Sequence, residues 1–253
     1  MKSLDNIRLD IKIGYSIDVE SVETVTNPLQ VTVGDVLTYF PKKYSDDSIA
    51  IFNKKLLGVD VFIHFNLLVN LSVEKKVHIK SLYEYLLACD VFNAKGLVVH
   101  VGSNENREDG FDNSIKNLMC FKGNHKILLE NMCGGHRMNV YDMLWLRDKV
   151  DVGLCFDTAH AWGAGIDVMG SISFIEKYVP QLVHLNNPDK AVALGSGRDL
   201  HSNSLFNGVF SNEEVFNIID VCGKNNVSMV LENKFYIEDL EFIKNSLKME
   251  VIA

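Results

Sequence analysis

The residues of this chain that are best suited to chemistry stand at the ends of apolar runs. Six runs, each long enough for a buried strand, finish in a histidine or a carboxylate: His64, His100, Glu130, Asp157, His184 and Glu232. Parallel strands that close into a barrel bring such ends to one rim, where barrel enzymes keep their active sites. Zinc binds imidazole nitrogen and carboxylate oxygen. The pattern therefore predicts a metal centre at that rim.

Two short motifs add three further candidate ligands. In Asp157-Thr158-Ala159-His160 a histidine follows the strand-end carboxylate by three residues, and in Asp199-Leu200-His201 one residue separates two candidates. Residues at positions i and i+2 project to the same side where the chain is extended. The nine candidates are enough for more than one cation. Zinc is expected, and manganese can use similar ligands.

Each candidate taken alone has a structural explanation. A histidine at a strand end is more often a hydrogen-bonded core residue than a ligand, and a buried glutamate is usually paired. Six such residues at one end of successive strands favour a metal, because uncompensated charge at one rim would be costly. The other histidines are assigned elsewhere: His78 to a helix face, His125 to a loop and His136 to the surface.

The elements that must position these residues alternate along the chain. Two weaker apolar runs, residues 11–15 and 35–40, bring the number of predicted strands to eight. Apolar residues at helical spacing predict helices over residues 46–57, 73–92, 138–150, 172–178, 213–221 and 237–247. Ser211 is expected to cap the fifth of these, with glutamates in its first turn. The alternation is typical of a parallel sheet, and eight repeats favour a closed barrel.

The length and the connections agree with a single domain. A (β/α)8 TIM barrel needs roughly 250 residues, and this chain has 253, with four prolines and no Gly/Ser-rich linker. We expect one α/β barrel domain over residues 1–253. Three polar connections stand out: residues 103–112, expected to be a mobile surface loop, residues 131–137, and the longest, residues 186–210.

Composition limits the classes of function. The net charge of -8 argues against a protein that holds nucleic acid by bulk basicity, although three divalent cations at the site would offset most of it. The five cysteines are scattered without zinc-finger or redox spacing, so they are expected to be reduced and mostly buried. No apolar stretch suggests a signal peptide or a membrane span. We expect an intracellular protein in a reducing compartment.

Several stretches resemble the endonuclease IV family, the zinc-dependent apurinic/apyrimidinic endonucleases of DNA base-excision repair. They are Leu129-Glu130-Asn131, residues 152–165, His184-Leu185-Asn186 and the loop 195–201. The resemblance extends from about residue 14 to residue 234, and all nine metal positions of the family hold the expected residue type. It implies three zinc ions, the first held by His64, His100 and Glu130, the second by Glu130, Asp157, His184 and Glu232, and the third by His160, Asp199 and His201.

The resemblance also implies a reaction and a substrate. The reaction would be hydrolysis of the phosphodiester bond 5' to an abasic site in double-stranded DNA, giving 3'-hydroxyl and 5'-deoxyribose phosphate ends, with Glu130 as the bridging catalytic residue. Family members fill the gap in the duplex with side chains from the loops after the second and third strands. The corresponding residues here are Lys42 and Lys43 as phosphate contacts and Tyr44, Leu67 and Leu68 as wedges. A solvated basic turn and ordinary packing would also explain these five.

The chain departs from the family pattern at a few positions. The first strand reads Gly14-Tyr15-Ser16, where many members carry a histidine. Asn187 stands where an aspartate is usual, and Phe206-Asn207-Gly208 replaces a glycine-rich turn. Leu200 stands where an arginine is usual, and Arg198 is a candidate to replace that contact with DNA. Two rival functions stay open: a metal-dependent sugar isomerase or epimerase on a related barrel, and a DNA-damage binding module without catalysis. The third ligand set distinguishes the isomerase, which would not need it.

Overall fold

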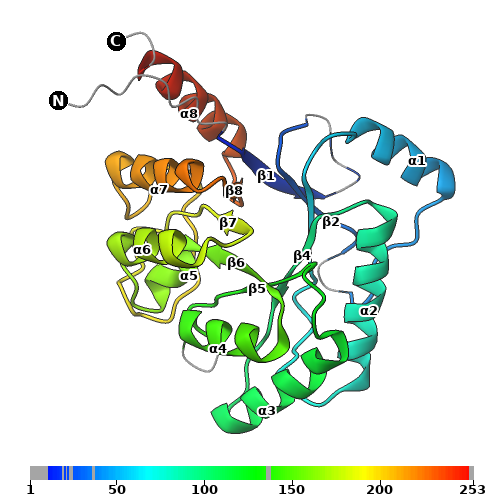
Figure 1. Ribbon diagram of the computed structural model, residues 1–253. Helices are drawn as coiled ribbons and strands as arrows, with labels where there is room; N and C mark the ends of the chain where they lie inside the picture. The colour runs from blue at the N-terminus through cyan, green and yellow to red at the C-terminus, as the bar shows by residue number, and fades with distance from the viewer. Residues whose placement is uncertain are drawn as a thin grey trace.

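Eight parallel strands pair with their neighbours in chain order and close into a barrel (Figure 1). The computed structural model describes residues 11–18, 20, 22, 25–35, 38–134 and 138–250. The strands are β1 (Ile13–Asp18), β2 (Leu29–Thr32), β3 (Val61–His64), β4 (Gly96–His100), β5 (Ile127–Glu130), β6 (Gly153–Asp157), β7 (Leu182–His184) and β8 (Ser228–Leu231). Tyr15 pairs with Leu231 where the last strand meets the first. The predicted TIM barrel is confirmed.

Helices follow most strands and cover the outside of the barrel. They are α1 (Asp46–Lys55), α2 (Lys76–Val91), α3 (Arg107–Leu118), α4 (Val140–Val150), α5 (Thr158–Gly163), α6 (Val168–Tyr178), α7 (Asn212–Lys224) and α8 (Tyr236–Glu250), with the short 3-10 helix η2 (Met119–Phe121). In Figure 1, α1 to α3 lie on one side of the barrel and α5 to α7 on the other. The six predicted helices are present with shifted ends. Ser211 caps α7 as predicted, in a reciprocal box with Glu214.

Two predictions about the elements were wrong. The second strand is β2 (Leu29–Thr32) and not residues 35–40, of which 36 and 37 lie outside the described residues. Gln30 interrupts the apolar run there and concealed the strand. Residues 103–112 are not a loop throughout, because α3 begins at Arg107 after the Asn106 side chain accepts two backbone N–H groups. Much of α3 faces solvent, so its polar composition resembled that of a loop.

The interior of the barrel holds an apolar layer directly beneath the rim. Phe62, Val98, Leu128, Cys155, Leu182 and Val230 form this cluster. Each stands two residues before one of the six strand-end candidates, so both sets share the inward face of the strands. Gly96 and Gly153 make room for it, because a Cβ on either would lie within 2.7 Å of a Leu128 methyl group. The rim side chains therefore rest on a packed floor.

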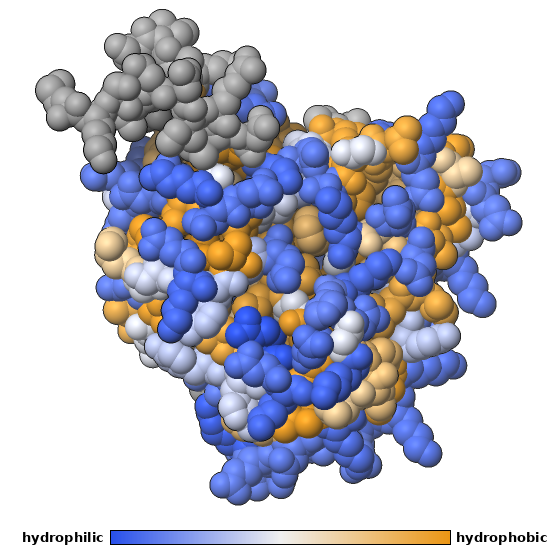
Figure 2. All heavy atoms as spheres, viewed as in Figure 1, coloured by the Kyte–Doolittle hydropathy of each residue, from blue (hydrophilic) through white to orange (hydrophobic). Residues whose placement is uncertain are grey.

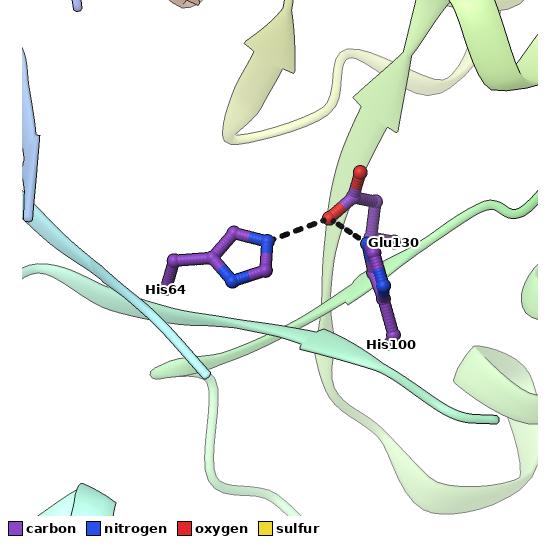
Figure 3. Close-up of side chains that lie close together, drawn as sticks. All are labelled: His64, His100 and Glu130. Carbon is purple, nitrogen blue, oxygen red and sulfur yellow. Dashed lines mark ion pairs between the residues drawn. The ribbon is translucent and has the colours of Figure 1, made fainter. Parts of the chain in front are cut away.

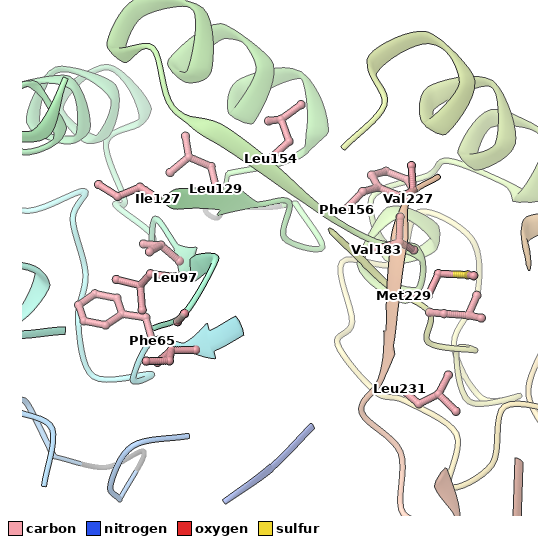
Figure 4. Packing of buried hydrophobic residues seen from close by; sticks show 14 of the residues in the cluster. Phe65, Leu97, Ile127, Leu129, Leu154, Phe156, Val183, Val227, Met229 and Leu231 are labelled. Atoms are coloured by element: carbon pink, nitrogen blue, oxygen red, sulfur yellow. The ribbon is translucent and has the colours of Figure 1, made fainter. Parts of the chain in front are cut away.

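The alternate strand residues face outward and form the main core with the helices. Figure 4 shows members of this cluster on successive strands, among them Leu97, Leu129, Phe156 and Met229. The outer surface seen in Figure 2 is mostly hydrophilic, with small apolar patches between charged groups. Among the described residues, no helix is long and apolar enough to cross a membrane.

Candidate metal centre

The first ligand group joins β3, β4 and β5. His64 and His100 turn their Nε2 atoms toward Glu130, at 3.5 and 2.8 Å from its Oε2 (Figure 3). One nitrogen or oxygen from each of the three residues lies within 4.8 Å of the others. The structure thus brings together the residues expected to hold one ion.

The second group shares Glu130 with the first and extends to β8. Nδ1 of His184 lies 3.1 Å from Oε1 of Glu130 and 3.1 Å from Oε2 of Glu232. The same nitrogen is 3.9 Å from Oδ2 of Asp157. One oxygen of Glu130 faces this group and the other faces the first, so a single carboxylate connects the two.

The third group draws on α5 and on the long loop of residues 186–210. Oδ1 of Asp199 lies between two rings, 3.2 Å from Nε2 of His160 and 3.5 Å from Nε2 of His201. A carboxylate oxygen of Asp157 lies within 4.8 Å of ligand atoms of both histidines. The buried thiol of Cys133 lies within the same distance of ligand atoms of His160 and Asp199. The expected trio is adjacent, with a further carboxylate and a thiol at its edge.

The carboxylates and histidines at the rim shift one another's pKa values. Burial alone raises the pKa of Glu130, but the neighbouring His100 and His184 outweigh it and hold that pKa well below its usual range. Burial alone lowers the pKa of His184, yet the adjacent Cys155 sulfur and the carboxylates of Glu130 and Glu232 together raise that pKa well above its ordinary value. The same balance raises the pKa of His160 beside Asp157. Ionised carboxylates therefore face imidazole rings at the rim.

The histidine rings are oriented by oxygens behind them. Nδ1 of His64 lies 2.7 Å from the Phe65 carbonyl, and Nδ1 of His160 lies 2.9 Å from the Asn131 carbonyl. These nitrogens must donate to the carbonyls, which leaves each Nε2 directed into the rim. Metal-binding histidines are usually held in this way.

Three buried polar atoms at the rim have no hydrogen-bond partner among the described residues: Nε2 of His100, Oε2 of Glu130 and Nε2 of His201. The first two approach to 2.8 Å without hydrogen-bond geometry. An unsatisfied buried polar group costs about 1–3 kcal/mol, and a cation between such atoms would remove that cost. The donor set of imidazole nitrogens and carboxylate oxygens fits zinc.

Side-chain amides hold the carboxylates in place. Asn131 exchanges two hydrogen bonds with the backbone of Asp157, at 2.9 and 2.8 Å. Asn186 donates to Oδ2 of Asp157 at 2.6 Å and to Oε2 of Glu232 at 3.2 Å. Gln30 contacts both His184 and Glu232. The two asparagines lie in motifs that the sequence singled out, whereas Gln30 was missed because β2 was misplaced.

The apolar and aromatic residues expected to contact DNA have different surroundings. Leu67 and Leu68 are 56% and 37% exposed. Tyr44 is half-buried and packs edge-on against Phe92, with ring centroids 5.4 Å apart, so its ring contributes to the core of the protein.

The charged candidates for DNA contact are all exposed. Lys42 pairs with Glu20, and Lys43 lies beside it in the sequence. Arg198 donates to the Ala191 carbonyl at 3.2 Å, within the long loop. Leu200 is also exposed on this loop. Contact of these side chains with DNA stays a prediction.

The departure at Asn187 has a structural reason. Its Nδ2 donates to the carbonyls of Leu205 and Phe210, at 2.7 and 3.0 Å, and its Oδ1 accepts the Phe210 N–H at 2.8 Å. An ionised aspartate could not donate the first two bonds. Gly208 packs against the same side chain, since a Cβ there would lie 2.2 Å from Oδ1. Asn187 therefore braces the long loop.

The remaining histidines and cysteines lie mostly as expected. His78 is buried on α2 and His125 lies in a turn, while His136 is outside the described residues. All five cysteines are free thiols and four are buried. Cys155 lies beneath Glu130 and His184, and burial raises the pKa of its thiol to about 12. It is therefore a neutral floor residue.

Comparisons with known proteins agree with this arrangement. Residues 20–246 match the family model described as xylose isomerase-like TIM barrel. A probable endonuclease 4 of Mycobacterium marinum is 30% identical over 190 residues, which cover 69% of this chain and 73% of the relative. Another from Mycobacterium leprae is 33% identical over 165 residues, 59% of this chain and 64% of the relative.

Solved structures give the same fold. Endonuclease IV from Thermus thermophilus matches with a TM-score of 0.77 at 22% identity, covering 94% of this chain and 99% of the other. A D-tagatose 3-epimerase-like protein matches with a TM-score of 0.72 at 18% identity, covering 96% and 100%. These likenesses by themselves show only the barrel. Together with the family model and the sequence relatives, they establish that the chain belongs to the endonuclease IV family of xylose isomerase-like TIM barrels.

Proposed function

We propose that this protein is a zinc-dependent endonuclease of DNA repair that cuts double-stranded DNA at abasic sites. The bond hydrolysed is the phosphodiester 5' to the abasic site, and the ends are a 3'-hydroxyl and a 5'-deoxyribose phosphate. One observation carries the proposal: nine ligand-capable residues from seven segments meet at the barrel rim in overlapping groups. The names of the sequence relatives, probable endonuclease 4, support it.

Three zinc ions would be held by the three groups described above, with manganese possible at one or more sites. When bound, such ions supply Lewis-acid chemistry, acidifying water and neutralising charge that develops on a phosphate.

Glu130 is the residue on which the centre depends. Its two oxygens face different groups, Oε2 toward His64 and His100 and Oε1 toward His184. Full burial keeps water away from this carboxylate and strengthens its electrostatic interactions. The side chain thus fixes the spacing of the two groups before substrate arrives, which is the preorganisation that phosphoryl chemistry needs.

DNA would approach the same rim across exposed loops. Lys42, Lys43 and Arg198 supply positive charge for phosphates on a chain whose net charge is -8. Leu67 and Leu68 are exposed on the turn that follows β3, and in this proposal they enter the base stack as apolar wedges. The Tyr44 ring packs edge-on against Phe92, so it is a weaker candidate for a wedge than the two leucines.

A sugar isomerase or epimerase is the competing function, and the likeness to a D-tagatose 3-epimerase-like protein favours it at the level of fold. The group of His160, Asp199 and His201 argues for the nuclease, because one- or two-metal sugar chemistry would not require it. A binding module without catalysis is disfavoured because it would gain nothing from nine costly side chains.

The test is nicking of a duplex with one abasic site, with and without chelator, alongside elemental analysis. We expect about three zinc ions per chain, chelator-sensitive nicking and ends as stated above. Epimerisation of a ketose with no nicking would favour the isomerase instead. Zinc-dependent binding to abasic DNA without cleavage would favour the binding module.

A further inference from the structure

Gln30 lies on β2, fully buried, between two candidate ligands that come from other strands. Its Oε1 is 2.8 Å from Nε2 of His184, and its Nε2 is 2.7 Å from Oε1 of Glu232. The same amide nitrogen lies 3.1 Å from the hydroxyl oxygen of Ser16 on β1. All polar atoms of this amide are therefore engaged at the rim.

The chemistry of Glu232 fixes which way the amide points. An ionised carboxylate only accepts hydrogen bonds, so the NH2 group of Gln30 must face it. A flipped amide would set two oxygens 2.7 Å apart. The network therefore assigns the amide oxygen to the side of His184.

The position of the amide oxygen then determines the state of the His184 ring. A carbonyl oxygen cannot donate, so Nε2 of His184 must carry the proton of that hydrogen bond. Nδ1 is left facing Glu130, Asp157 and Glu232. Histidines that bind metals are commonly fixed in this manner by an oxygen on the far nitrogen.

We infer that Gln30 is a positioning residue of the second ligand group. Its amide orients His184 and Glu232 so that Nδ1 of His184 and one oxygen of Glu232 face the metal. The inference rests on the proposed function, since it requires a cation in that group. It also gives a role to Ser16, which lies in the first-strand stretch that departs from the family pattern, as the acceptor for the second amide hydrogen.

Substitution of Gln30 tests the inference in the zinc-loaded protein. Gln30→Leu removes both contacts, and Gln30→Glu keeps an oxygen for His184 but removes the donor to Glu232. Asn117→Leu is a matched control, because Asn117 is a buried amide that, among the described residues, donates only to the carbonyls of Leu71 and Val73. Zinc affinity is measured by competition with a chromophoric chelator, and the protonated ring nitrogen by NMR of protein labelled with 15N-histidine.

In Gln30→Leu we expect one of the bound zinc ions to be held about 10–100-fold more weakly. The Nε2–H correlation of His184, assigned with His184→Ala, should shift or disappear. Gln30→Glu should retain that correlation, and Asn117→Leu should retain both the correlation and the affinity. Gln30→Leu with unchanged zinc affinity and an unchanged correlation would overturn the inference. So would a Gln30→Glu variant that lacks the correlation.

The wild-type protein separates this inference from the proposed function. If the wild type nicks abasic DNA and the Gln30 variants behave like it, only the positioning role is overturned. If the wild type binds no zinc and does not nick, the proposed function fails, and the inference fails with it.

Discussion

The strand-end ligands and the loop ligands are supported in different ways. Glu130, Asp157 and His184 are fully buried on the barrel, and two or more side chains contact each of them. Asp199 and His201 stand in the loop of residues 186–210, with side chains 38% and 22% exposed. The barrel therefore fixes the first two groups, whereas the third forms only when the loop lies against it.

This difference indicates how the centre would respond to change. Strand ends move little, so removing one of their side chains leaves buried partners without compensation. A loop ligand that is removed leaves a gap that water can enter. Truncation of a strand-end side chain should lower stability and activity together, and truncation in the loop should lower activity with little effect on stability.

Glu130→Gln should give the largest effect on activity. The substitution keeps the shape but removes the charge that joins two ligand groups, so we expect a loss of about 1000-fold or more in nicking rate. Circular dichroism should report an intact fold, and elemental analysis a reduced zinc content. Full activity in this variant would contradict the bridging role of the carboxylate.

His184→Ala and Asp199→Ala compare the two regions directly in the metal-free protein. His184→Ala leaves Glu130 and Glu232 facing each other without the imidazole, so we expect Tm to fall by about 10 °C. Asp199→Ala removes a partly exposed carboxylate and should lower Tm by less than about 3 °C. After zinc is added back, each variant should bind one zinc ion fewer per chain than the wild type. Equal Tm losses would remove the distinction between barrel and loop.

The pH dependence of stability should separate the metal-free from the zinc-loaded protein. The folded-state pKa values of His64, His160 and His184 are raised, so their contribution is complete below about pH 6.5 and is lost as the pH rises through the raised values. The pKa values of Glu130 and Glu232 are lowered, so their contribution is complete above about pH 4.3 and is lost on acidification.

Zinc replaces one proton on each doubly protonated histidine ring, so zinc loading should stabilise the protein most at higher pH. Thermal melting from about pH 5.5 to about pH 8 should give a growing difference in Tm between loaded and metal-free protein. Zinc uptake in a weak buffer at about pH 7 should release protons. A constant Tm difference across this range would contradict the assigned directions.

The strand ends were predictable from the sequence because buried strands leave a distinct pattern. An apolar run that stops at His100 or Glu130 has one simple explanation in a parallel barrel. β2 was not predictable in this way, because Gln30 places a polar residue inside a short run. The polar side chain of Gln30 is explained only by its hydrogen bonds to His184 and Glu232, which are more than 150 residues away in the sequence. The sequence likewise does not predict that Asp199 lies between His160 and His201, because that contact depends on how the long loop folds.

The smallest effect is expected at the exposed leucines after β3, and it tests whether loop residues read the substrate. The buried Asn66 accepts the N–H groups of Leu68 and Val69 at 3.0 and 3.1 Å, so the turn that displays Leu67 and Leu68 is already formed. Replacing both leucines with alanine should weaken binding to abasic duplex about 10-fold by loss of buried apolar area. Binding to intact duplex at the same salt concentration should change by less than about twofold, because phosphate contacts dominate it. Leu57→Ala, at an exposed leucine after α1, is the matched control and should change neither. An equal loss on both duplexes would mean that the two leucines support the fold of the loop and do not enter the DNA.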